Sequence, residues 1–393
     1  MFLLVYGCVV HKSFISTPSS PCLKFSEMQA VSLTALLLLI GLLTVEKALT
    51  DNKQTEEQGC TVGDELPGQM GTGNVSETPR EVGYFEKAMK ENPELAKQFN
   101  KLKNTRSVNI LVTGKTGTGK STLINGLVGE KVAKEGEELD PETVKVDGYT
   151  RTVKGIAMTF YDSPGLQDGK TNEVEYMKDM EHKCKNIDLV LFTIRMDDTR
   201  LQEGEKEAMH KLTCAFGASF WEHSVFVLTF ANKVEDPADH ENSAEYFNKR
   251  LTKWTAKLPE TLLQRSLKKC PNGEVVKVPI DVAHKIPIVP AGYYKQENLP
   301  GHPYWFSEFW QYCFMRMNED AQLLLLKVNE DRFKPVKEVS KSDFNQQLYQ
   351  QPIVIHEGSP IKKAIASAVG AGIGGTMFGP VGAALGSMLG LFF

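Results

Sequence analysis

Residues 109–122 read Asn-Ile-Leu-Val-Thr-Gly-Lys-Thr-Gly-Thr-Gly-Lys-Ser-Thr, a hydrophobic run that passes directly into a glycine-rich turn. The turn matches the pattern G-x-x-x-x-G-K-[ST], and helix-like residues 121–128 follow it. A strand, a turn of this kind and a helix in succession form a phosphate-binding loop. The sequence therefore predicts a nucleotide site built from Gly114, Lys115, Thr116, Gly117, Thr118, Gly119, Lys120, Ser121 and Thr122.

The parts of this turn have separate roles in phosphate binding. Glycines let backbone N–H groups close around a phosphate, and the helix that starts near Gly119 adds its positive end. Lys120 is expected to reach the β- and γ-phosphates, and the Ser121 hydroxyl to complete a Mg²⁺ shell of phosphate oxygens and water. Lys120 and Ser121 are therefore the first candidate catalytic residues.

A second phosphate-side element ends the strand expected over 155–161, where the chain reads Asp162-Ser-Pro-Gly165. An acidic residue at this place in P-loop enzymes holds Mg²⁺ through water. Gly165 has no side chain to keep its N–H from a γ-phosphate. In the polar loop 140–152, one threonine should contact the γ-phosphate and Mg²⁺, with Thr143 the first choice and Thr150 the second. The expected metal ligands are Ser121, Thr143 and Asp162.

A base-reading element is expected after the strand at 224–230, where the chain reads Asn232-Lys233-Val-Glu235-Asp236. A carboxylate in such a turn accepts the N1–H and N2–H pair of guanine, and the lysine packs over the base. Adenine offers no such donor pair, so the motif favours GTP and GDP over adenine nucleotides. Whether Glu235 or Asp236 faces the base stays open. Residues 288–292 end the next strand and are expected to close over the base.

Strand-like and helix-like segments alternate around these motifs. This order predicts a three-layer α/β domain with a mainly parallel sheet, a P-loop NTPase of the G-domain type, over residues 83–330 with a leading helix. The expected strands are 107–113, 155–161, 188–194, 224–230 and 286–289, and the expected helices are 121–128, 174–184, 203–216, 244–267 and 306–326.

The composition restricts the class of protein further. The chain has 393 residues, 45 basic against 49 acidic, with 41% hydrophobic and 24% charged residues. These values are typical of soluble domains and exclude whole-chain disorder, collagen and a long coiled coil. The nearly balanced charge does not favour a nucleic-acid partner. Seven scattered cysteines without a C-x-x-C pair predict neither a disulfide framework nor a zinc site, and favour a reducing compartment.

The N-terminal residues 1–49 hold an apolar targeting or anchor segment. Its uncharged run, 30–45, is shorter than the roughly 20 residues of a comfortable membrane span, so a signal core and a short anchor both stay open, as does cleavage. Met28 lies just before the run and is an alternative start to Met1. The polar segments 50–82 and 331–360 have the composition of linkers.

The C-terminal residues 361–393 form a second apolar segment, with no charge after Lys363. Gly382, Gly386 and Gly390 share one face of a helix, a spacing that lets helices approach closely in lipid. Pro380 interrupts the run, so a kinked span and a two-helix hairpin both stay open. We expect residues 361–393 to be buried in membrane lipid or in an oligomeric interface.

The two ends conflict about the compartment. Lys362 and Lys363 beside the C-terminal segment favour a membrane-associated protein whose G domain faces the cytosol. A cleaved N-terminal signal would instead deliver the domain to the lumen of the secretory pathway. Asn74-Val-Ser76 is a glycosylation acceptor whose occupancy would distinguish these alternatives.

The motifs together resemble the immunity-associated nucleotide-binding GTPases (GIMAP or AIG type), which are close kin of septins and the chloroplast-envelope Toc GTPases. The resemblance covers about 107–316 and rests on residues 114–125, the Asp-Ser-Pro-Gly-Leu turn at 162–166 and Trp310-x-x-Cys313. It implies GTP or GDP with Mg²⁺, GTP-controlled dimerisation into a homodimer or oligomer, and membrane attachment by a C-terminal segment. Ser163 departs from the family's usual threonine, and the spelling of the Asn232 motif departs as well.

Leu166 occupies the position at which Ras-like enzymes place a glutamine that orients the attacking water. A leucine cannot do this, so we expect slow intrinsic GTP hydrolysis that dimerisation or a partner raises. Two functions stay open: a membrane-anchored GTPase switch with nucleotide-controlled self-association, and a nucleotide-locked scaffold with negligible turnover. A P-loop kinase is disfavoured, because Asn232 and Lys233 would then have no role.

Overall fold

The computed structural model describes residues 84–91, 93–134, 145–166, 173–184, 186–235, 243–293, 299–340, 342–343, 346, 348–356 and 359–361. They belong to one compact unit, Thr78–Phe393. The apolar helical segments expected within 1–49 and 361–393, and the expected linker 50–82, lie outside the described residues, apart from Ile361. Within the described part, none of the helices has the length and apolar character that a membrane crossing requires.

The main sheet has six strands in the order β2-β3-β1-β4-β5-β6. Strand β1 pairs in parallel with β3 and β4, β4 with β5, and β5 with β6, whereas β2 pairs antiparallel with β3. Four parallel pairings and one antiparallel edge strand confirm the expected mainly parallel sheet. The strands are β1 Val108–Gly114, β2 Asp147–Val153, β3 Ile156–Asp162, β4 Leu189–Arg195, β5 Ser224–Thr229 and β6 Ile288–Pro290.

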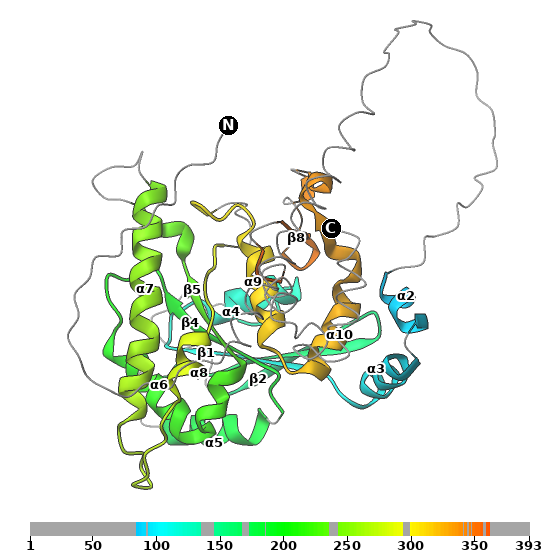
Figure 1. Ribbon diagram of the computed structural model, residues 1–393. Coiled ribbons are helices and arrows are strands. Elements are labelled where there is room, and N and C mark those ends of the chain that lie inside the picture. The colour runs from blue at the N-terminus through cyan, green and yellow to red at the C-terminus, as the bar shows by residue number, and fades with distance from the viewer. Residues whose placement is uncertain are drawn as a thin grey trace, which may run out of the picture. The chain divides into compact units, whose positions relative to one another are not determined.

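Helices cover both faces of this sheet, which gives the three layers (Figure 1). Helices α5, α6 and α7 pack together on one face, while α4, α9 and α10 lie on the other. The central strands β4 and β5 are accordingly buried almost throughout, as near-continuous hydrophobic parallel strands require. The helices are α2 Tyr84–Glu91, α3 Pro93–Thr105, α4 Lys120–Val128, α5 Glu173–Lys183, α6 Glu203–Phe216, α7 Ser243–Ser266, α8 Ile280–Lys285, α9 Trp305–Arg316 and α10 Glu319–Asn329.

Two elements differ from the sequence expectation. The helix expected over 306–326 is two helices, because Asn318 caps α10 by accepting a hydrogen bond from the Ala321 N–H and so starts a new helix. The polar loop expected over 140–152 contains most of strand β2, whose side chains are largely exposed. An edge strand of this kind carries no hydrophobic run, so its sequence reads as a loop.

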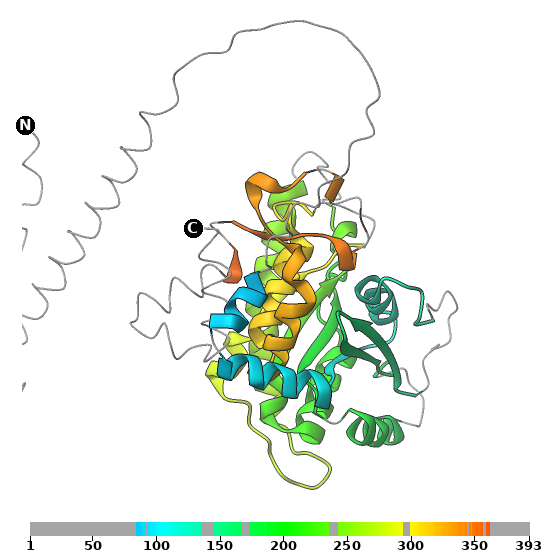
Figure 2. The same ribbon diagram turned by 90° about the vertical axis from the view of Figure 1, so that its right-hand side faces the viewer.

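The segment after α10 also differs from the linker expected over 331–360. Its short strands, β7 Phe333–Pro335 and β8 Ile353–Ile355, pair in parallel, and β8 packs on α9. Ile353, Val354 and Ile355 are all buried. We call residues 333–361 the C-terminal arm; in Figure 2 it is the orange segment that passes over α9 toward the teal helix α4. Its polar average composition conceals a few strongly buried side chains.

The cysteines differ from expectation as well. Cys214, in α6, forms a disulfide with Cys270, which follows α7, across a sequence separation of 56 residues. Helices α6 and α7 pack side by side, and this packing brings the two sulfurs together. Cys184 and Cys313 are free and buried, and burial raises the pKa of the Cys184 thiol to about 12. Spacing along the chain gives no sign of this pairing.

Candidate functional site

The glycine-rich turn between β1 and α4 is held by the neighbouring strands. A Cβ on Gly114 would lie 2.5 Å from the Thr193 carbonyl oxygen of β4, and Gly114 has a φ of +145°, so no other residue fits there. The hydroxyl of Thr118 shares a 2.6 Å hydrogen bond with that of Thr193, and Thr229 of β5 donates to the Thr118 carbonyl oxygen at 2.8 Å. Hydrogen bonds from strands β4 and β5 thus fix the shape of the glycine-rich turn.

The Lys120 side chain lies along the inside of this turn. Its Nζ donates to the Lys115 carbonyl oxygen at 3.1 Å and approaches the Gly114 carbonyl oxygen at 3.5 Å, and the residue is buried. A buried ammonium surrounded by backbone dipoles is strongly attractive to a phosphate anion. The expected place of Lys120 inside the phosphate loop is therefore the observed one.

Ser121 and Asp162 meet at the phosphate side of the turn. The Ser121 hydroxyl, at the start of α4, donates to Asp162 Oδ2 at 2.8 Å, at the end of β3. Asp162 is 1% exposed. A hydroxyl oxygen and a carboxylate oxygen at this separation are donors of the kind that Mg²⁺ prefers, with phosphate oxygens and water as the remaining ligands. The residues present therefore fit Mg²⁺, although the described part of the chain holds no cluster of three or more His, Cys, Asp or Glu side chains.

The turn after Asp162 lies directly on the glycine-rich turn. A Cβ on Gly165 would lie 1.8 Å from Thr116 Oγ1 and 2.6 Å from Thr116 Cα. The Leu166 N–H donates to the Gly114 carbonyl oxygen at 3.2 Å, and the Leu166 side chain is fully buried. The two phosphate-side motifs therefore form one surface, and Leu166 points into the core.

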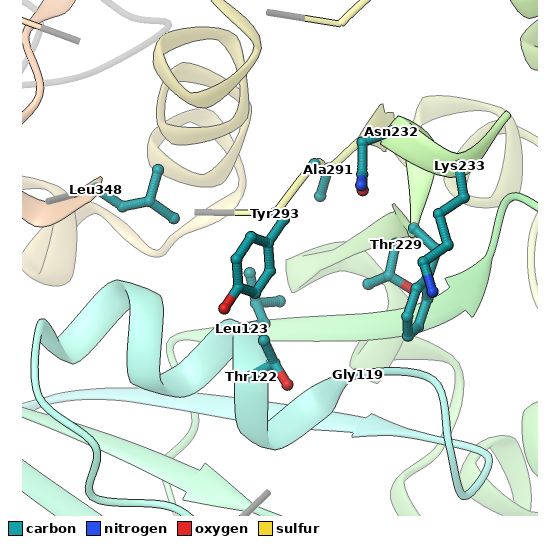
Figure 3. A pocket seen from close by; sticks show the side chains of 11 residues that line it. Gly119, Thr122, Leu123, Thr229, Asn232, Lys233, Ala291, Tyr293 and Leu348 are labelled. Atoms are coloured by element: carbon teal, nitrogen blue, oxygen red, sulfur yellow. The ribbon is translucent and has the colours of Figure 1, made fainter. Parts of the chain in front are cut away.

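A pocket of about 380 Å³ lies on the other side of the turn, at the carboxyl ends of β5 and β6 (Figure 3). Asn232 and Lys233 line one side, and Tyr293 and Leu348 line the side away from Lys233. Ligands of open α/β sheets bind outside the carboxyl ends of the strands, so this position suits a nucleotide base and sugar. The pocket is lined by Gly119, Thr122, Leu123, Thr229, Phe230, Asn232, Lys233, Ala291, Gly292, Tyr293 and Leu348.

Phe230 is the wall of this pocket beside the glycine-rich turn. Its φ is +54°, an uncommon value for a residue with a side chain. The Arg195 guanidinium lies 4.0 Å and the Lys233 ammonium 5.0 Å from the centre of its ring. Asp197 pairs with Arg195 at 2.6 Å and, through that hydrogen bond, raises the pKa of the guanidinium. Two cations held over one aromatic ring provide a stacking surface with a positive edge.

The structure brings together most of the expected site residues. Gly114 to Thr122, Asp162 and Gly165 form the phosphate side, and Asn232 and Lys233 line the base-side pocket. Glu235 is exposed and does not line the pocket. Thr143 and Asp236 lie outside the described residues. Thr150 shares a hydrogen bond with Thr159 on the β2–β3 ladder, so it is a sheet residue.

Sequence reasoning missed several residues of the site, of which four are informative. Thr193 and Thr229 support the glycine-rich turn from neighbouring strands, and Phe230 precedes the Asn232 motif without belonging to it. Leu348 is far along the chain, in a segment of linker composition. The first three stand at or near strand ends, which is the one signal by which a sequence could have found them.

The phosphate cradle, the Ser121–Asp162 pair and the base-side pocket, on a mainly parallel six-stranded sheet, define a P-loop nucleotide-binding domain of the G-domain class. Residues 108–267 match the AIG1 family model. Residues 108–267 therefore form an AIG1 family domain.

Curated relatives match part of the chain. Translocase of chloroplast 34 of Arabidopsis thaliana is 31% identical over 156 residues, which cover 38% of this chain and 48% of the relative. GTP-binding protein A of Dictyostelium discoideum is 28% identical over 234 residues, covering 57% of this chain and 50% of the relative. The chain thus spans about half the length of these two relatives. It covers 19% of the length of a third relative, Translocase of chloroplast 125 of Physcomitrium patens.

Solved structures give a partial overlap. Arabidopsis Toc33 in complex with Mg²⁺ and GMPPNP superposes with a TM-score of 0.41 at 25% identity, covering 57% of this chain and 89% of that one. Arabidopsis Toc33 with GDP and Mg²⁺ gives the same TM-score at 24% identity, covering 61% and 90%.

Proposed function

We propose that this protein binds GTP and GDP with Mg²⁺ and hydrolyses GTP slowly. The observation that supports this most directly is the 2.8 Å contact between Ser121 and Asp162 beside the buried Lys120. Lys120 and Ser121 belong to the glycine-rich turn and Asp162 to the second phosphate-side motif, and together they suit a nucleoside triphosphate. Asn232 and Lys233 on the base-side pocket support guanine, and the name GTP-binding protein A of one relative agrees with it.

The hydrolytic step depends on charge and position. Ser121, Asp162 and, as expected from the sequence, Thr143 would hold Mg²⁺. The bound ion would neutralise the phosphate charge. In the proposed complex Lys120 would bind the β- and γ-phosphates, and the Gly165 N–H would donate to the γ-phosphate. The buried Leu166 leaves no side chain at that position to orient a water molecule. Slow turnover follows from this.

Nucleotide affinity tests the proposal. Lys120→Ala removes a charge-assisted contact worth about 1.5–3 kcal/mol, so GTP affinity should fall roughly ten- to a hundredfold. Asn232→Ala should reduce the preference for GTP over ATP. Lys253→Ala, at an exposed position on α7, is the matched control and should leave affinity unchanged. Equal affinity of the wild-type protein for ATP and GTP would refute the guanine assignment and revive a P-loop kinase.

We further propose that the protein is a switch whose self-association depends on the nucleotide. Because Leu166 supplies no polar group, a second copy or a partner must complete the site for efficient turnover. The turnover per molecule should therefore rise with protein concentration. Fast turnover that does not depend on concentration would contradict this, whereas permanently trapped GTP in the purified protein would favour the nucleotide-locked scaffold.

Membrane attachment through 361–393, with the G domain facing the cytosol, completes the proposal. Its support is the uncharged sequence after Lys363. The Cys214–Cys270 disulfide argues for the alternative, because disulfides persist mainly in oxidising compartments. Expression in a secretory host cell and glycosidase treatment decide between them: glycan on Asn74 places the domain in the lumen, and a bare Asn74 with vesicle binding supports the cytosolic side.

A further inference from the structure

The C-terminal arm reaches the base-side pocket, although it lies beyond the AIG1 family match. Leu348, in the turn Leu348–Gln350 (η7), lines the pocket and is 2% exposed. Among the described residues, the others that line the pocket lie between Gly119 and Tyr293. The pocket wall on this side therefore depends on whether the arm is docked.

A half-buried arginine fixes the turn that carries Leu348. Arg332, between α10 and β7, donates from Nε to the Gln351 carbonyl oxygen at 2.8 Å and from Nη2 to the Leu348 carbonyl oxygen at 3.3 Å. Its guanidinium also lies 5.7 Å from the centre of the Phe306 ring. Arg332, the residue just before the arm, thus holds the turn 348–351 through two backbone carbonyls.

Strand β8 ties the arm to α9. The Val354 N–H donates to Ser307 Oγ at 2.8 Å, and Gln311 Nε2 donates to the Val354 carbonyl oxygen at 3.1 Å. Further on, the Ile361 N–H donates to Gln311 Oε1 at 3.3 Å. These contacts bury polar groups in pairs, which makes the docked position specific.

The residue next to Leu348 touches the end of the P-loop helix. A Cβ on Gly129, which ends α4 with a φ of +84°, would lie 2.1 Å from the Tyr349 ring, so the ring rests on the bare backbone there. The Arg151 guanidinium of β2 lies 4.0 Å from the centre of the same ring, and Arg151 also donates to the Val128 carbonyl oxygen. The turn therefore contacts the pocket, α4 and the strand that follows the Thr143 loop.

We propose that Leu348 is a nucleotide-positioning residue and that nucleotide binding and docking of the arm stabilise each other. This inference rests on the proposed guanine-nucleotide function. In the docked arm Leu348 forms part of the pocket wall, and a ligand that contacts only the docked conformation favours that conformation. The coupling is reciprocal, so an undocked arm weakens nucleotide binding by the same factor. The arm ends at Ile361, just before the uncharged C-terminal sequence, so the coupling would link the pocket to that segment.

The first test measures GDP affinity of the full-length protein by titration calorimetry. Leu348→Ala should raise the Kd for GDP about tenfold, equivalent to about 1.4 kcal/mol. Leu262→Ala, the same truncation at a fully buried position of α7 away from the pocket and the arm, should lower the melting temperature without changing the Kd. Gln350→Ala, at the exposed position of the same turn, should change neither.

The second test needs no variant and therefore does not depend on folding of Leu348→Ala. Saturating GDP should slow amide hydrogen exchange over 348–355 of the wild-type protein about fivefold or more. If wild type binds GDP but shows no such protection, and Leu348→Ala binds GDP as wild type does, the coupling is overturned while the proposed function stands. If wild type does not bind GDP at all, both are overturned.

Discussion

Replacing Gly165 by alanine tests whether the two phosphate-side motifs form one surface. The alanine Cβ would lie 1.8 Å from Thr116 Oγ1 and 2.6 Å from Thr116 Cα. A rotation of the Thr116 side chain relieves the first clash, but the second involves the backbone of the glycine-rich turn. The turn after Asp162 must therefore move away from the phosphate cradle.

The magnitude follows from the interactions that this movement affects. Overpacking of a close-packed site costs about 1–3 kcal/mol, and separation of the turns also breaks the 3.2 Å hydrogen bond from the Leu166 N–H to the Gly114 carbonyl oxygen, worth about 1 kcal/mol. The free energy of unfolding should fall by about 2–4 kcal/mol, and the melting temperature by roughly 5–15 °C.

Thermal unfolding and nucleotide affinity are the two measurements. We expect a greater loss of affinity for a GTP analogue than for GDP, because the Gly165 N–H is the proposed donor to the γ-phosphate. Gly217→Ala is the control: Gly217 has a φ of +81°, but a Cβ added there would meet no atom within 4 Å, so this variant measures backbone strain without a clash. Thr116→Gly combined with Gly165→Ala should restore stability only in part, since the clash with the backbone of residue 116 stays.

A melting temperature of Gly165→Ala within about 2 °C of wild type, together with an unchanged preference between GTP analogue and GDP, would refute this reasoning. That result would mean that the two turns separate without cost. The close approach of Thr116 and Gly165 would then have no role in reading the γ-phosphate.

Three further predictions concern other parts of the molecule. Ser121→Ala should lower GDP affinity about tenfold in Mg²⁺ but hardly at all in EDTA, since the hydroxyl acts through the metal; an equal loss in both buffers would exclude that role. Reducing Cys214–Cys270 should lower the free energy of unfolding by about 4 kcal/mol in urea titrations, from the entropy of a loop of 56 residues, and the double variant Cys214→Ser with Cys270→Ser should show no effect of reductant. Burial raises the folded-state pKa of Cys184 to about 12, above its unfolded value, so its contribution to stability is complete below about pH 8.5 and falls by about 1.4 kcal/mol per pH unit up to pH 12; Cys184→Ala should remove that slope from the pH dependence of unfolding.

The phosphate side of the site could be predicted from the sequence because its residues are close together in the chain. Gly114 to Thr122 form one turn, and Asp162 ends the strand that pairs beside it. Parallel strands bring their carboxyl ends to one edge, so a strand end with an acidic residue predicts proximity to the glycine-rich turn. The 2.8 Å contact between Ser121 and Asp162 confirms that expectation.

The base side shows where such reasoning ends. Asn232 and Lys233 line the pocket, as the motif predicts, whereas Glu235, one of its two candidate carboxylates, is exposed, and the other, Asp236, lies outside the described residues. Phe230, which is not part of the motif, also lines the pocket. The direction of the Phe230 side chain depends on the backbone φ of +54° at this residue and on the two cations near its ring, Arg195 and Lys233. Arg195 comes from β4, so local sequence around the motif does not contain that information.

The sequence by itself determined the class of this protein, because the α/β alternation and the glycine-rich turn are local patterns whose physics needs few neighbours. Only the tertiary structure decided that Cys214 bonds Cys270 and that the arm closes the pocket with Leu348. Both depend on packing between helices and strands far apart in the chain. A segment whose average composition is polar can still dock when a few of its side chains are buried by packing. Val354 is buried in β8, which packs on α9, and Leu348 in the turn that packs on α4.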